Sequence, residues 1–560
     1  MFGQPLDRLC KMSAVKDGCR AIKIGGPLGE AVMQSLAGRL SNFIASDESE
    51  PLSVWAKSYR SQNHAGDWYG EHVGKWLAAT SLAARRTGNS SLLERVVAAA
   101  DFLINQQEPS GYLGNYAPSA LSRIDSGQAH ANRTWDVWVM ACCMRGLTEV
   151  FLATGESRFA EAIERLVRFL EVVMDSDPRF AYWGNHDGLS SVIVLDPLMD
   201  FYRATGFERA KELAFRVLGI ADERLDLIRG LECRDVSLLG TGKIYQLCWL
   251  FTGLSKLDVD VSRAYQCLVE SHLTPLGGPW GGIATHKEVF NSAGFFSPEG
   301  LTETCSTMAW IQLNAEMYRQ SPEALFAESA ERAAVNALLG AMDSNGSDWC
   351  YFTFPNGRRN NTYYWACCKS SGALALEELH GWFEGPEVPI WIPFDNEFLN
   401  LAISEGYESA KILVKVGTPI RVRIPEWACE FDADRRFRRV AHFADFGPCA
   451  AGETINITLN AKPRVIQTQS RLEHHGQEIA RTDYFGLEVG PWVYATGPER
   501  IGPVFKLSQI KPESHFLQGA QGEFVLNSPQ IGNVVFRRYF EAGGRQDGKW
   551  RAVWHQVDWQ

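Results

Sequence analysis

The chain has 560 residues, enough for one very large core or several ordinary ones, and two domains are our initial expectation. Its 55 basic and 66 acidic residues give a net charge of −11 without any stripe rich in Lys and Arg, which argues against a nucleic-acid partner. The sequence shows neither a signal peptide at its start nor a later run of ~18 apolar residues, so it predicts a cytoplasmic protein without a membrane partner.

From about residue 28 to residue 383, the spacing of apolar residues is mostly helical. Thr-Gly breaks recur along this region, each ending one helix before the next begins. After the first break, Ser91 and Glu94 have the spacing of a capping box. The breaks predict left-handed glycines just past helix ends at Gly88, Gly155, Gly206 and Gly253.

The distance between breaks suits a helical hairpin as the repeating unit. Residues 303–339 predict one more hairpin, with Pro322 near its turn. Stacked hairpins form either an open solenoid or a closed α/α toroid. Loops rich in Gly and Trp, such as GGPWGG at 277–282, favour a closed barrel whose loops gather at one mouth.

The C-terminal third of the chain alternates apolar and polar residues with a period of two, which is typical of strands. The clearest stretches are KILVKV, PIRVRIPEW, ETINITL, FGLEVGPWVYA and NVVFRRYF. We therefore predict a helical domain over residues 1–384 and a β-sandwich-like domain over residues 385–560, packed against each other.

The 13 cysteines are odd in number and scattered, which suits reduced thiols better than a disulfide framework. Two stretches are candidates for chemistry: ETC at Glu303–Cys305, and the vicinal pair Cys367–Cys368 in YYWACCKSSG. Vicinal cysteines are poor disulfide partners for each other. Three thiolates and one carboxylate form a set of ligands that Zn²⁺ accepts. The alternative is that these are ordinary buried cysteines, which is our interpretation of Cys142 and Cys143.

Several motifs, in the same order along roughly residues 63–497, resemble glycoside hydrolase family 127, the β-L-arabinofuranosidase family. The pairing of ETC with CC is the specific part of this resemblance. The other matching stretches are HVGKWLAA, PSGYLGNY, RVRIPEWA and VGPWVYATG. The resemblance implies an (α/α)6 barrel followed by β-sandwich domains, which agrees with the helical and then β texture of the chain.

The same resemblance implies which residues carry the chemistry. Cys367 would be the nucleophile, and the general acid/base would be a glutamate upstream of ETC. Glu288 matches that position after a one-residue gap, while Glu299 is the less favoured choice, and a solvated loop carboxylate is the ordinary alternative for Glu288. The implied zinc ligands are Glu303, Cys305, Cys367 and Cys368.

These roles are chemically coherent. A free cysteine has a pKa of ~8.5 and is mostly protonated at neutral pH, whereas coordination to a divalent cation removes the proton. A retaining glycosidase needs a nucleophile on one face of the anomeric carbon and a proton donor beside the leaving oxygen. A zinc-bound thiolate would serve as the first and Glu288 as the second.

The chain departs from the family at two places that hold the sugar. A His-Glu pair at the start of one helix is replaced by Trp135 and Asp136, and a Gly-His pair on a later helix is replaced by Gly242 and Lys243. We include Trp135, Asp136, Lys243 and Tyr364 among the substrate-binding candidates. A lysine brings positive charge, so Lys243 either faces an anionic group such as a sugar carboxylate or is a solvated lysine.

The sequence thus predicts a zinc-dependent, retaining exo-glycoside hydrolase acting on small glycosides, either β-L-arabinofuranosides or a related sugar, an acidic one included. Two alternatives remain open. One is a lyase or epimerase with structural zinc, in which Tyr363 or Tyr364 transfers the proton. The other is a non-catalytic sugar-binding protein. A homodimer formed through the β domain is compatible with the sequence.

Overall fold

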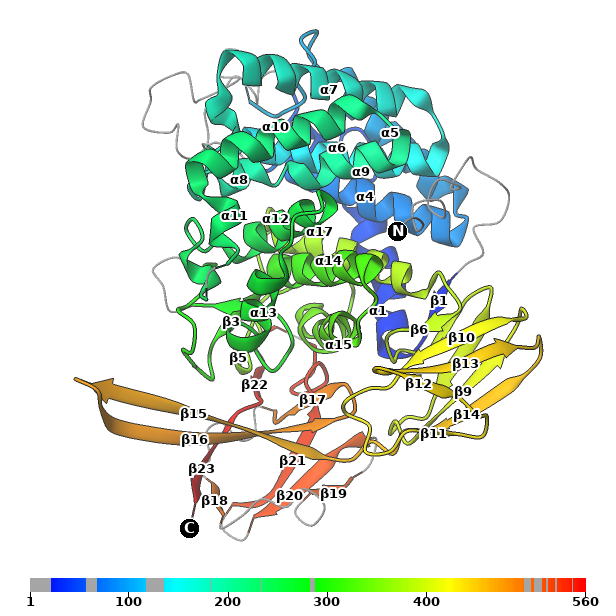
Figure 1. Cartoon of the computed structure of the whole chain (residues 1–560), viewed down its shortest axis with the longest axis vertical. Coiled ribbons are helices and arrows are strands. Elements are labelled where there is room, and N and C mark those ends of the chain that lie inside the picture. The colour runs from blue at the N-terminus through cyan, green and yellow to red at the C-terminus, as the bar shows by residue number, and fades with distance from the viewer. Residues whose placement is uncertain are drawn as a thin grey trace, which may run out of the picture.

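Helices occupy the first two thirds of the chain and strands the last third. Figure 1 shows the helical part above two β units. The computed structural model describes residues 22–56, 68–116, 135–182, 184–232, 234–282, 288–497, 505–507, 516–519, 522–528, 531–545 and 547–559.

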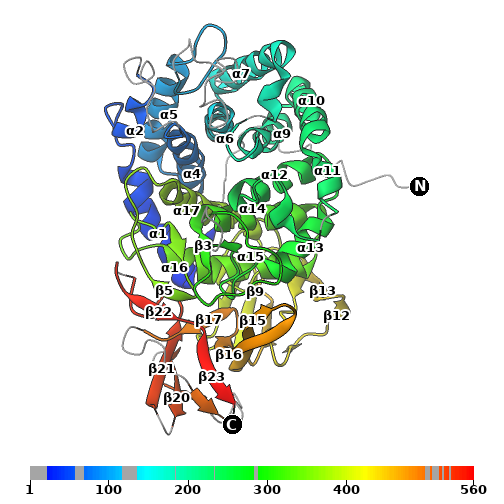
Figure 2. The ribbon, with the colours of Figure 1, turned by 90° about the vertical axis from the view of Figure 1, so that its left-hand side faces the viewer.

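Six of the described helices form a closed inner ring, which Figure 2 shows from one side. Each inner helix packs against the next in chain order, and the last packs against the first. The inner helices are α4 (Glu71–Thr87), α6 (Asp136–Thr154), α9 (Leu195–Thr205), α12 (Ile244–Lys256), α14 (Thr304–Gln320) and α17 (Cys367–Glu378). The predicted closed α/α barrel is therefore confirmed.

A second layer of helices surrounds this ring (Figure 2). It consists of α1 (Gly26–Ser35), α5 (Ser90–Asn105), α7 (Ser157–Ser176), α10 (Glu208–Leu225), α13 (Ser262–Ser271) and α15 (Ala324–Arg332). Shorter helical turns connect the layers: η2 (Leu36–Leu40), α2 (Glu50–Ser53), η5 (Pro178–Ala181), α8 (Leu189–Val192), α11 (Leu227–Gly230), η6 (Val236–Leu238), η7 (Ala333–Leu338), α16 (Leu339–Ala341) and η8 (Leu379–Phe383).

Three of the four predicted helix-ending glycines end a helix. Gly88, Gly155 and Gly206 follow α4, α6 and α9 with φ angles of 63°, 70° and 72°, in the left-handed region that glycine adopts readily. The prediction for Gly253 is wrong, because α12 continues past it. A Cβ at Gly253 would lie 2.9 Å from the backbone nitrogen of Asp196, so this glycine serves the close packing of α12 on α9.

The predicted capping box at Ser91 and Glu94 is also wrong. Helix α5 (Ser90–Asn105) has its N-cap two residues before Ser91, at Asn89, whose side chain accepts a hydrogen bond from the backbone N–H of Leu92. Asparagine is as effective as serine at this position, so the first capping residue in the sequence caps the helix.

Helix α6 is long and apolar enough to cross a membrane by length and composition, whereas the sequence predicted no such segment. It lies in the barrel, where 67% of its most apolar 18-residue window is buried. A buried core helix meets the same criterion, because it too is apolar around most of its circumference. Cys142 and Cys143 lie on this helix and are fully buried, as predicted.

The strands after the barrel, together with β1 before it, form three larger sheets. A six-stranded sheet has the order β1 (Lys23–Ile24), β7 (Phe394–Asp395), β8 (Leu399–Ile403), β9 (Ser409–Val414), β14 (Thr454–Thr458) and β11 (Asp432–Ala433). A four-stranded sheet has the order β12 (Arg438–Val440), β13 (Phe443–Cys449), β10 (Thr418–Arg423) and β6 (Glu387–Val388). The third sheet contains β18 (Phe505–Leu507), β23 (His555–Trp559), β16 (Gln477–Val489), β17 (Trp492–Ala495), β21 (Gly532–Arg538), β20 (Phe524–Ser528) and β19 (Phe516–Gln518), with β15 (Arg464–His474) paired to β16.

The predicted period-two segments coincide with these strands. Along β9 the side chains of Ala410, Ile412 and Val414 are buried while their neighbours are exposed, as alternation requires. Strands β15 and β16 form a long two-stranded ribbon that extends beyond the sheet in Figure 1. The alternating pattern in the sequence thus identifies the strands but not the length of this ribbon.

Two strand pairings cross the predicted division between residues 384 and 385. Lys23 and Ile24 pair with strand β7 of the six-stranded sheet. Strand β22 (Trp550–Ala552), near the C-terminus, pairs with β5 (Asn356–Arg358) on the barrel side. Between the two parts, Arg423 of β10 is completely buried and forms an ion pair of 2.7 Å with Glu331 of α15. The linear division remains a prediction, and these contacts show how closely the two parts are joined.

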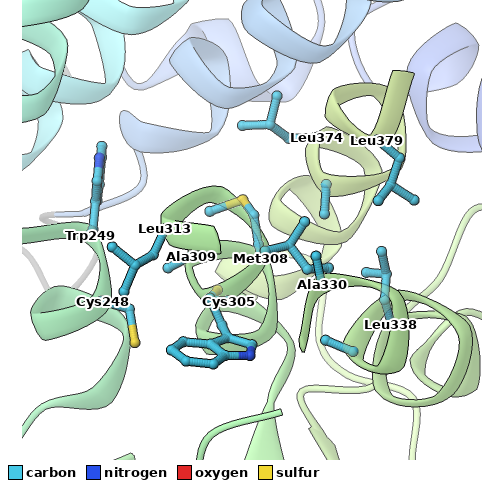
Figure 3. Packing of buried hydrophobic residues seen from close by; sticks show 14 of the residues in the cluster. Cys248, Trp249, Cys305, Met308, Ala309, Leu313, Ala330, Leu338, Leu374 and Leu379 are labelled. Carbon is cyan, nitrogen blue, oxygen red and sulfur yellow. The ribbon is translucent and has the colours of Figure 1, made fainter. Parts of the chain in front are cut away.

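Apolar side chains of α14 pack in the core of the barrel. Figure 3 shows Met308, Ala309 and Leu313 of α14 among apolar residues of neighbouring helices, with Cys305 at the start of the same helix. All four side chains are almost fully buried. Dense packing of this kind fixes the position of the first turn of α14.

Two glycines allow inner helices α4 and α6 to approach closely. A Cβ at Gly74 would lie 2.2 Å from the carbonyl oxygen of Cys142, and a Cβ at Gly146 would lie 2.5 Å from the carbonyl oxygen of Gly74. Because both neighbours are backbone atoms, neither can move aside cheaply. The contact sets the spacing of the two helices that begin at Glu71 and Asp136.

We predict that Gly74→Ala destabilises the protein by about 1–3 kcal/mol, because the added methyl group overlaps the backbone of α6. Gly219→Ala, on exposed helix α10 with open space around it, should instead stabilise the protein by about 0.5–1 kcal/mol. Thermal unfolding monitored by circular dichroism measures both effects. Equal midpoints for the two variants would contradict the close α4–α6 contact.

Candidate metal centre and active site

The candidate site lies where inner helices α14 and α17 begin. Glu303 precedes α14, Cys305 is its second residue, and Cys367 and Cys368 are the first two residues of α17. The unpaired N–H groups in the first turn of a helix carry partial positive charge, which stabilises nearby anions and lowers the pKa of thiols. Two helix N-termini therefore face the predicted metal ligands.

The structure brings the four predicted ligands together. One ligand atom from each of the four residues lies within 4.8 Å of the others. The Sγ atom of Cys305 is 3.2 Å from that of Cys367 and 3.3 Å from that of Cys368, and the latter two are 3.9 Å apart. Sulfurs placed tetrahedrally around a zinc ion with Zn–S bonds of about 2.3 Å are separated by about 3.8 Å, which agrees with the Cys367–Cys368 distance and is longer than the other two.

The three thiols differ in their tendency to ionise. Hydrogen bonds from Cys305 and Cys368 hold the pKa of the Cys367 thiol well below its ordinary value. Burial raises the pKa values of Cys305 and Cys368 well above theirs. Several thiolates in one buried cluster require a compensating cation. The donor set, with three soft sulfurs and one carboxylate, fits a divalent cation such as zinc.

Contacts to both of its oxygens orient the carboxylate of Glu303. Oε1 lies 4.0 Å from Sγ of Cys368, while Oε2 accepts hydrogen bonds from Lys243 Nζ at 3.2 Å and from Ser306 Oγ at 3.1 Å. Burial raises the pKa of Glu303 to about 8, and the ammonium of Lys243 opposes this shift. Outer contacts that fix a ligand's orientation are typical of metal sites.

Lys243 is buried rather than solvated. Its Nζ atom forms ion pairs with Glu288 and with Glu303, so its closest anionic partners belong to the protein. Burial disfavours its charge, but these two carboxylates outweigh that effect and raise the pKa of Lys243. The structure therefore rules out the solvated alternative.

The backbone around Glu288 explains why its side chain reaches Lys243. The N–H of Ile244 donates to the carbonyl oxygen of Glu288 at 3.1 Å, and the N–H of Phe290 donates to that of Gly242 at 2.9 Å. These hydrogen bonds join the Glu288 segment to the start of α12. Glu299, the less favoured candidate for the acid, is exposed on the following loop.

Tyr351 was not singled out by the sequence, yet it joins the predicted acid to the predicted nucleophile. Its hydroxyl group donates to Oε1 of Glu288 and lies 3.6 Å from Sγ of Cys367. Tyr351 precedes strand β4 (Phe352–Thr353), which pairs with β3 (Leu301–Glu303), and its carbonyl oxygen accepts from the N–H of Thr304 at 3.0 Å. Burial, with the nearby Cys367 and carboxylates, raises the pKa of Tyr351 well above its ordinary value, so its phenol stays protonated and can donate.

A second buried ion pair, which sequence analysis missed, lies near the sulfur cluster on inner helix α4. Lys75 Nζ is 3.1 Å from Glu71 Oε2, and Trp138 donates its indole N–H to the same oxygen. Burial raises the pKa of Glu71 to about 7, and Lys75 opposes this shift. Lys75 also lies 5.0 Å from the centre of the Tyr245 ring, so its charge faces an aromatic surface. The sequence does carry a signal for this pair: in EHVGKWLAA, Glu71 and Lys75 are four residues apart, the spacing that brings side chains together on one face of a helix.

The other substrate-binding candidates lie around the inner-helix N-termini. Trp135 precedes α6, with its ring 5.4 Å from that of Trp138. Asp136 is buried and accepts a hydrogen bond of 2.8 Å from the hydroxyl of Tyr112. The ring of Tyr364 is 41% exposed and lies 5.2 Å from that of Trp365. Their roles in binding sugar remain predictions.

Tyr363, the other proposed proton-transfer tyrosine, is 56% exposed. Burial of the remainder, followed by the charge of Cys367, raises the pKa of Tyr363 to about 12. Unlike Tyr351, it forms no hydrogen bond with Glu288 or Cys367 within the described part of the chain. Tyr351 is therefore the tyrosine with direct contacts to both groups.

The sequence matches the profile of the β-L-arabinofuranosidase GH127 catalytic domain over residues 30–222 and 279–381, which together make up more than half of the chain. The chain belongs to glycoside hydrolase family 127. Its membership confirms the predicted enzyme class, a glycoside hydrolase, and the matched region includes all four residues of the cysteine and glutamate cluster.

Solved structures agree with the fold of this family 127 chain. A GH127 β-L-arabinofuranosidase from Geobacillus stearothermophilus T6 superposes with a TM-score of 0.73 at 15% identity, covering 96% of this chain and 100% of the other. A GH127 β-arabinofuranosidase superposes with a TM-score of 0.73 at 14% identity, covering 96% and 97% of the two chains. At these identities the likeness establishes the barrel and β architecture. No curated protein matches the chain.

We predict that the family 127 protein, purified without chelators, carries one divalent metal ion per chain. Cys305→Ser and Cys368→Ser should each lower the metal content severalfold, because a hydroxyl is a poorer ligand than a thiolate for a soft site. Inductively coupled plasma mass spectrometry measures the stoichiometry. The matched control is Cys143→Ala, a buried member of the other vicinal pair, which should keep its metal. Unchanged stoichiometry in both serine variants would exclude this cluster as the site.

Proposed function

We propose that the chain is a retaining, exo-acting glycoside hydrolase that cleaves β-L-arabinofuranosides or a related sugar, an acidic one included. In this proposal Cys367 is the nucleophile and Glu288 is the general acid/base. Glu303, Cys305, Cys367 and Cys368 would hold a zinc ion. The glycoside hydrolase class comes from the family, while the substrate and mechanism are our proposal.

The observation that carries the proposal is the phenol of Tyr351 between Glu288 and Cys367. One hydroxyl group contacts both the carboxylate of Glu288 and the sulfur of Cys367, so these two groups lie on either side of a single oxygen atom. Retaining glycosidases place nucleophile and acid/base ~5 Å apart, on either side of the bond that breaks. The geometry therefore supports retention rather than inversion, which needs a wider gap for water.

In the first step, the thiolate of Cys367 attacks the anomeric carbon and a C–S bond forms. The glycosidic C–O bond breaks, and Glu288 transfers its proton to the departing oxygen. Tyr351 keeps Glu288 oriented by donating to its Oε1, and the same hydroxyl oxygen lies 3.6 Å from the sulfur of Cys367. The products of this step are the free alcohol and a glycosyl group attached to Cys367.

In the second step, water attacks the same carbon and gives its proton to the carboxylate of Glu288. The C–S bond breaks, and the thiolate of Cys367 is restored. Two inversions at one carbon give overall retention of configuration. When bound, a zinc ion would supply the positive charge that keeps the sulfur ionised at neutral pH and eases its departure.

Lys243 gives this site a cation where the family has histidine. Among the described residues, Glu288 and Glu303 use two of the three N–H donors of its ammonium, which leaves one donor for an oxygen of the sugar. This supports a substrate with a hydrogen-bond acceptor on that side. A carboxylate would be a stronger acceptor there than a hydroxyl group.

The proposal keeps a small-molecule glycoside as substrate, a cytoplasmic setting and a homodimer through the β domain. In the described part of the chain, free thiols are found at Cys142, Cys143, Cys248, Cys305, Cys350, Cys367, Cys368, Cys429 and Cys449, which is compatible with a reducing environment. Fractionation of the native host and light scattering of the purified protein test the setting and the dimer.

We predict that Cys367→Ser lowers hydrolysis of an aryl β-L-arabinofuranoside by roughly 10³-fold or more, because it removes the attacking atom. Glu288→Gln should lower the rate by about 10²–10⁴-fold for poor leaving groups and much less for activated aryl ones, which need no proton. A panel of aryl glycosides of graded leaving-group pKa, with product anomers followed by NMR, measures both effects.

Glu299→Gln is the matched control, since this carboxylate was the alternative acid and lies exposed on the loop. Its activity and its dependence on the leaving group should equal those of the natural chain. An unsaturated or isomerised product, or activity that survives Cys367→Ser, would favour a lyase or epimerase. Binding of the glycoside without turnover would favour a sugar-binding protein.

We predict that Lys243→Ala lowers kcat/KM for both neutral and carboxylate-bearing glycosides, because it frees Glu288 and Glu303. The loss for the acidic glycoside should be at least about tenfold greater, since a charge-assisted hydrogen bond is lost as well. Lys256→Ala is the matched control: this half-buried lysine also pairs with two carboxylates, Asp196 and Asp200, at the other end of α12. Equal losses on the two substrates would contradict recognition of an acidic sugar by Lys243.

A further inference from the structure

The turn that carries the two vicinal cysteines is held by a buried chain of hydrogen bonds. Nη2 of Arg39 donates to Oγ of Ser370 at 2.9 Å, and that oxygen lies 3.1 Å from Nδ1 of His72. Nε2 of His72 lies 2.9 Å from the carbonyl oxygen of Trp365. Arg39, His72 and Ser370 are all more than nine-tenths buried.

The chemistry of these groups fixes which atom donates in each of these three hydrogen bonds. A carbonyl oxygen only accepts, so Nε2 of His72 carries the proton and donates it to Trp365. Burial lowers the pKa of His72 to about 3, so the ring is neutral and its Nδ1 is an acceptor. The hydroxyl of Ser370 then donates to Nδ1 and accepts from Arg39, whose guanidinium has donors only.

This series of hydrogen bonds contacts the segment around Cys367 both before and after the cysteine. Trp365 stands two residues before Cys367, and Ser370 stands three residues after it in the first turns of α17. The ring of Trp365 is also stacked on that of Tyr69, with centres 4.3 Å apart and planes 5° apart. His72 thus links the loop before the cysteines to the helix after them.

The hydrogen bonds of His72 exclude a direct role in binding substrate or metal. Its two ring nitrogens are both used within the chain of hydrogen bonds, so neither is available to a substrate or a metal ion. It comes from α4, whereas the two elements it joins belong to one short stretch around residue 367. A side chain that ties both ends of a turn to a third element restricts how that turn can rotate.

We propose that His72 is a positioning residue for the proposed nucleophile, which it aims by tying Trp365 and Ser370 to helix α4. The inference rests on the proposed function in that Cys367 is the atom whose direction matters. A loosened turn would leave the metal ligands in place on average but would broaden the direction from which the sulfur approaches the anomeric carbon.

Three substitutions at His72 separate the two hydrogen bonds. His72→Gln keeps an N–H group near the position of Nε2, so it can still donate to Trp365. His72→Asn keeps an acceptor near the position of Nδ1 but loses that donor. His72→Phe keeps the ring and loses both, and Ser370→Ala is a milder change that removes the link to Arg39.

We predict that His72→Phe and His72→Asn lower kcat by about 10–100-fold with little change in KM, as loss of an outer-shell contact does in other metal sites. His72→Gln should recover most of that loss, and Ser370→Ala should show a smaller loss. The matched control is His380→Phe, a buried histidine at the other end of α17 whose Nδ1 is 2.9 Å from the carbonyl oxygen of Glu377. It should lower thermal stability and leave kcat unchanged.

A second readout does not depend on hydrolysis. The rate at which iodoacetamide alkylates Cys367, mapped by mass spectrometry, should change in His72→Phe and return in His72→Gln, with no change in His380→Phe. If Cys367→Ser retained hydrolysis, the proposed nucleophile would be wrong, while this alkylation rate would still report on the turn. Parallel losses in His72→Phe and His380→Phe, or no recovery in His72→Gln, would overturn the positioning role.

Discussion

One ligand atom from each of three cysteines and one glutamate lies within 4.8 Å of the others in the interior of this protein, and ionisation of these groups together would require a compensating positive charge. A divalent cation with three thiolates and one carboxylate still leaves a formal charge of about −2. The fold provides the remaining positive potential. Lys243 pairs with the carboxylate of Glu303, and the N-termini of α14 and α17 point at the sulfurs.

This requirement explains why the cluster lies at the helix N-termini of the barrel. The N-termini of α4, α12, α14 and α17 share one region, because His72 contacts Trp365, Lys243 contacts Glu303, and Cys305 contacts Cys367. Close packing through Gly74 and Gly146 keeps α4 near α6, and strand pairing between β3 and β4 sets Tyr351 beside the start of α14. The barrel therefore acts as a frame on which a few first-turn residues converge.

The differences from the family alter the surroundings of the cluster more than the cluster itself. Lys243 connects Glu288 to Glu303, so the predicted acid and a predicted metal ligand share one counter-ion. Asp136 accepts a hydrogen bond from the hydroxyl of Tyr112. A change of histidine to lysine at such a point replaces a group that can be neutral with one whose charge is held by two carboxylates.

The sequence by itself determined the features that depend on neighbouring residues. Period-two alternation located the strands, and the Thr-Gly breaks located helix ends at Gly88, Gly155 and Gly206, because both signals act over a few residues. The same local rules failed at Gly253, where packing on α9 explains the glycine. Resemblance of ETC and CC to a known family supplied the ligand set that spacing alone left open.

Only the tertiary structure decided the contacts between distant segments. Tyr351 meets Glu288 across 63 positions, and Lys243 meets Glu303 across 60, distances over which no sequence periodicity operates. His72 and Trp365 are 293 positions apart and meet because closure of the ring packs α17 against α4. The position of such groups depends on how whole helices pack, and that is set by the summed contacts of the core rather than by any one stretch of residues.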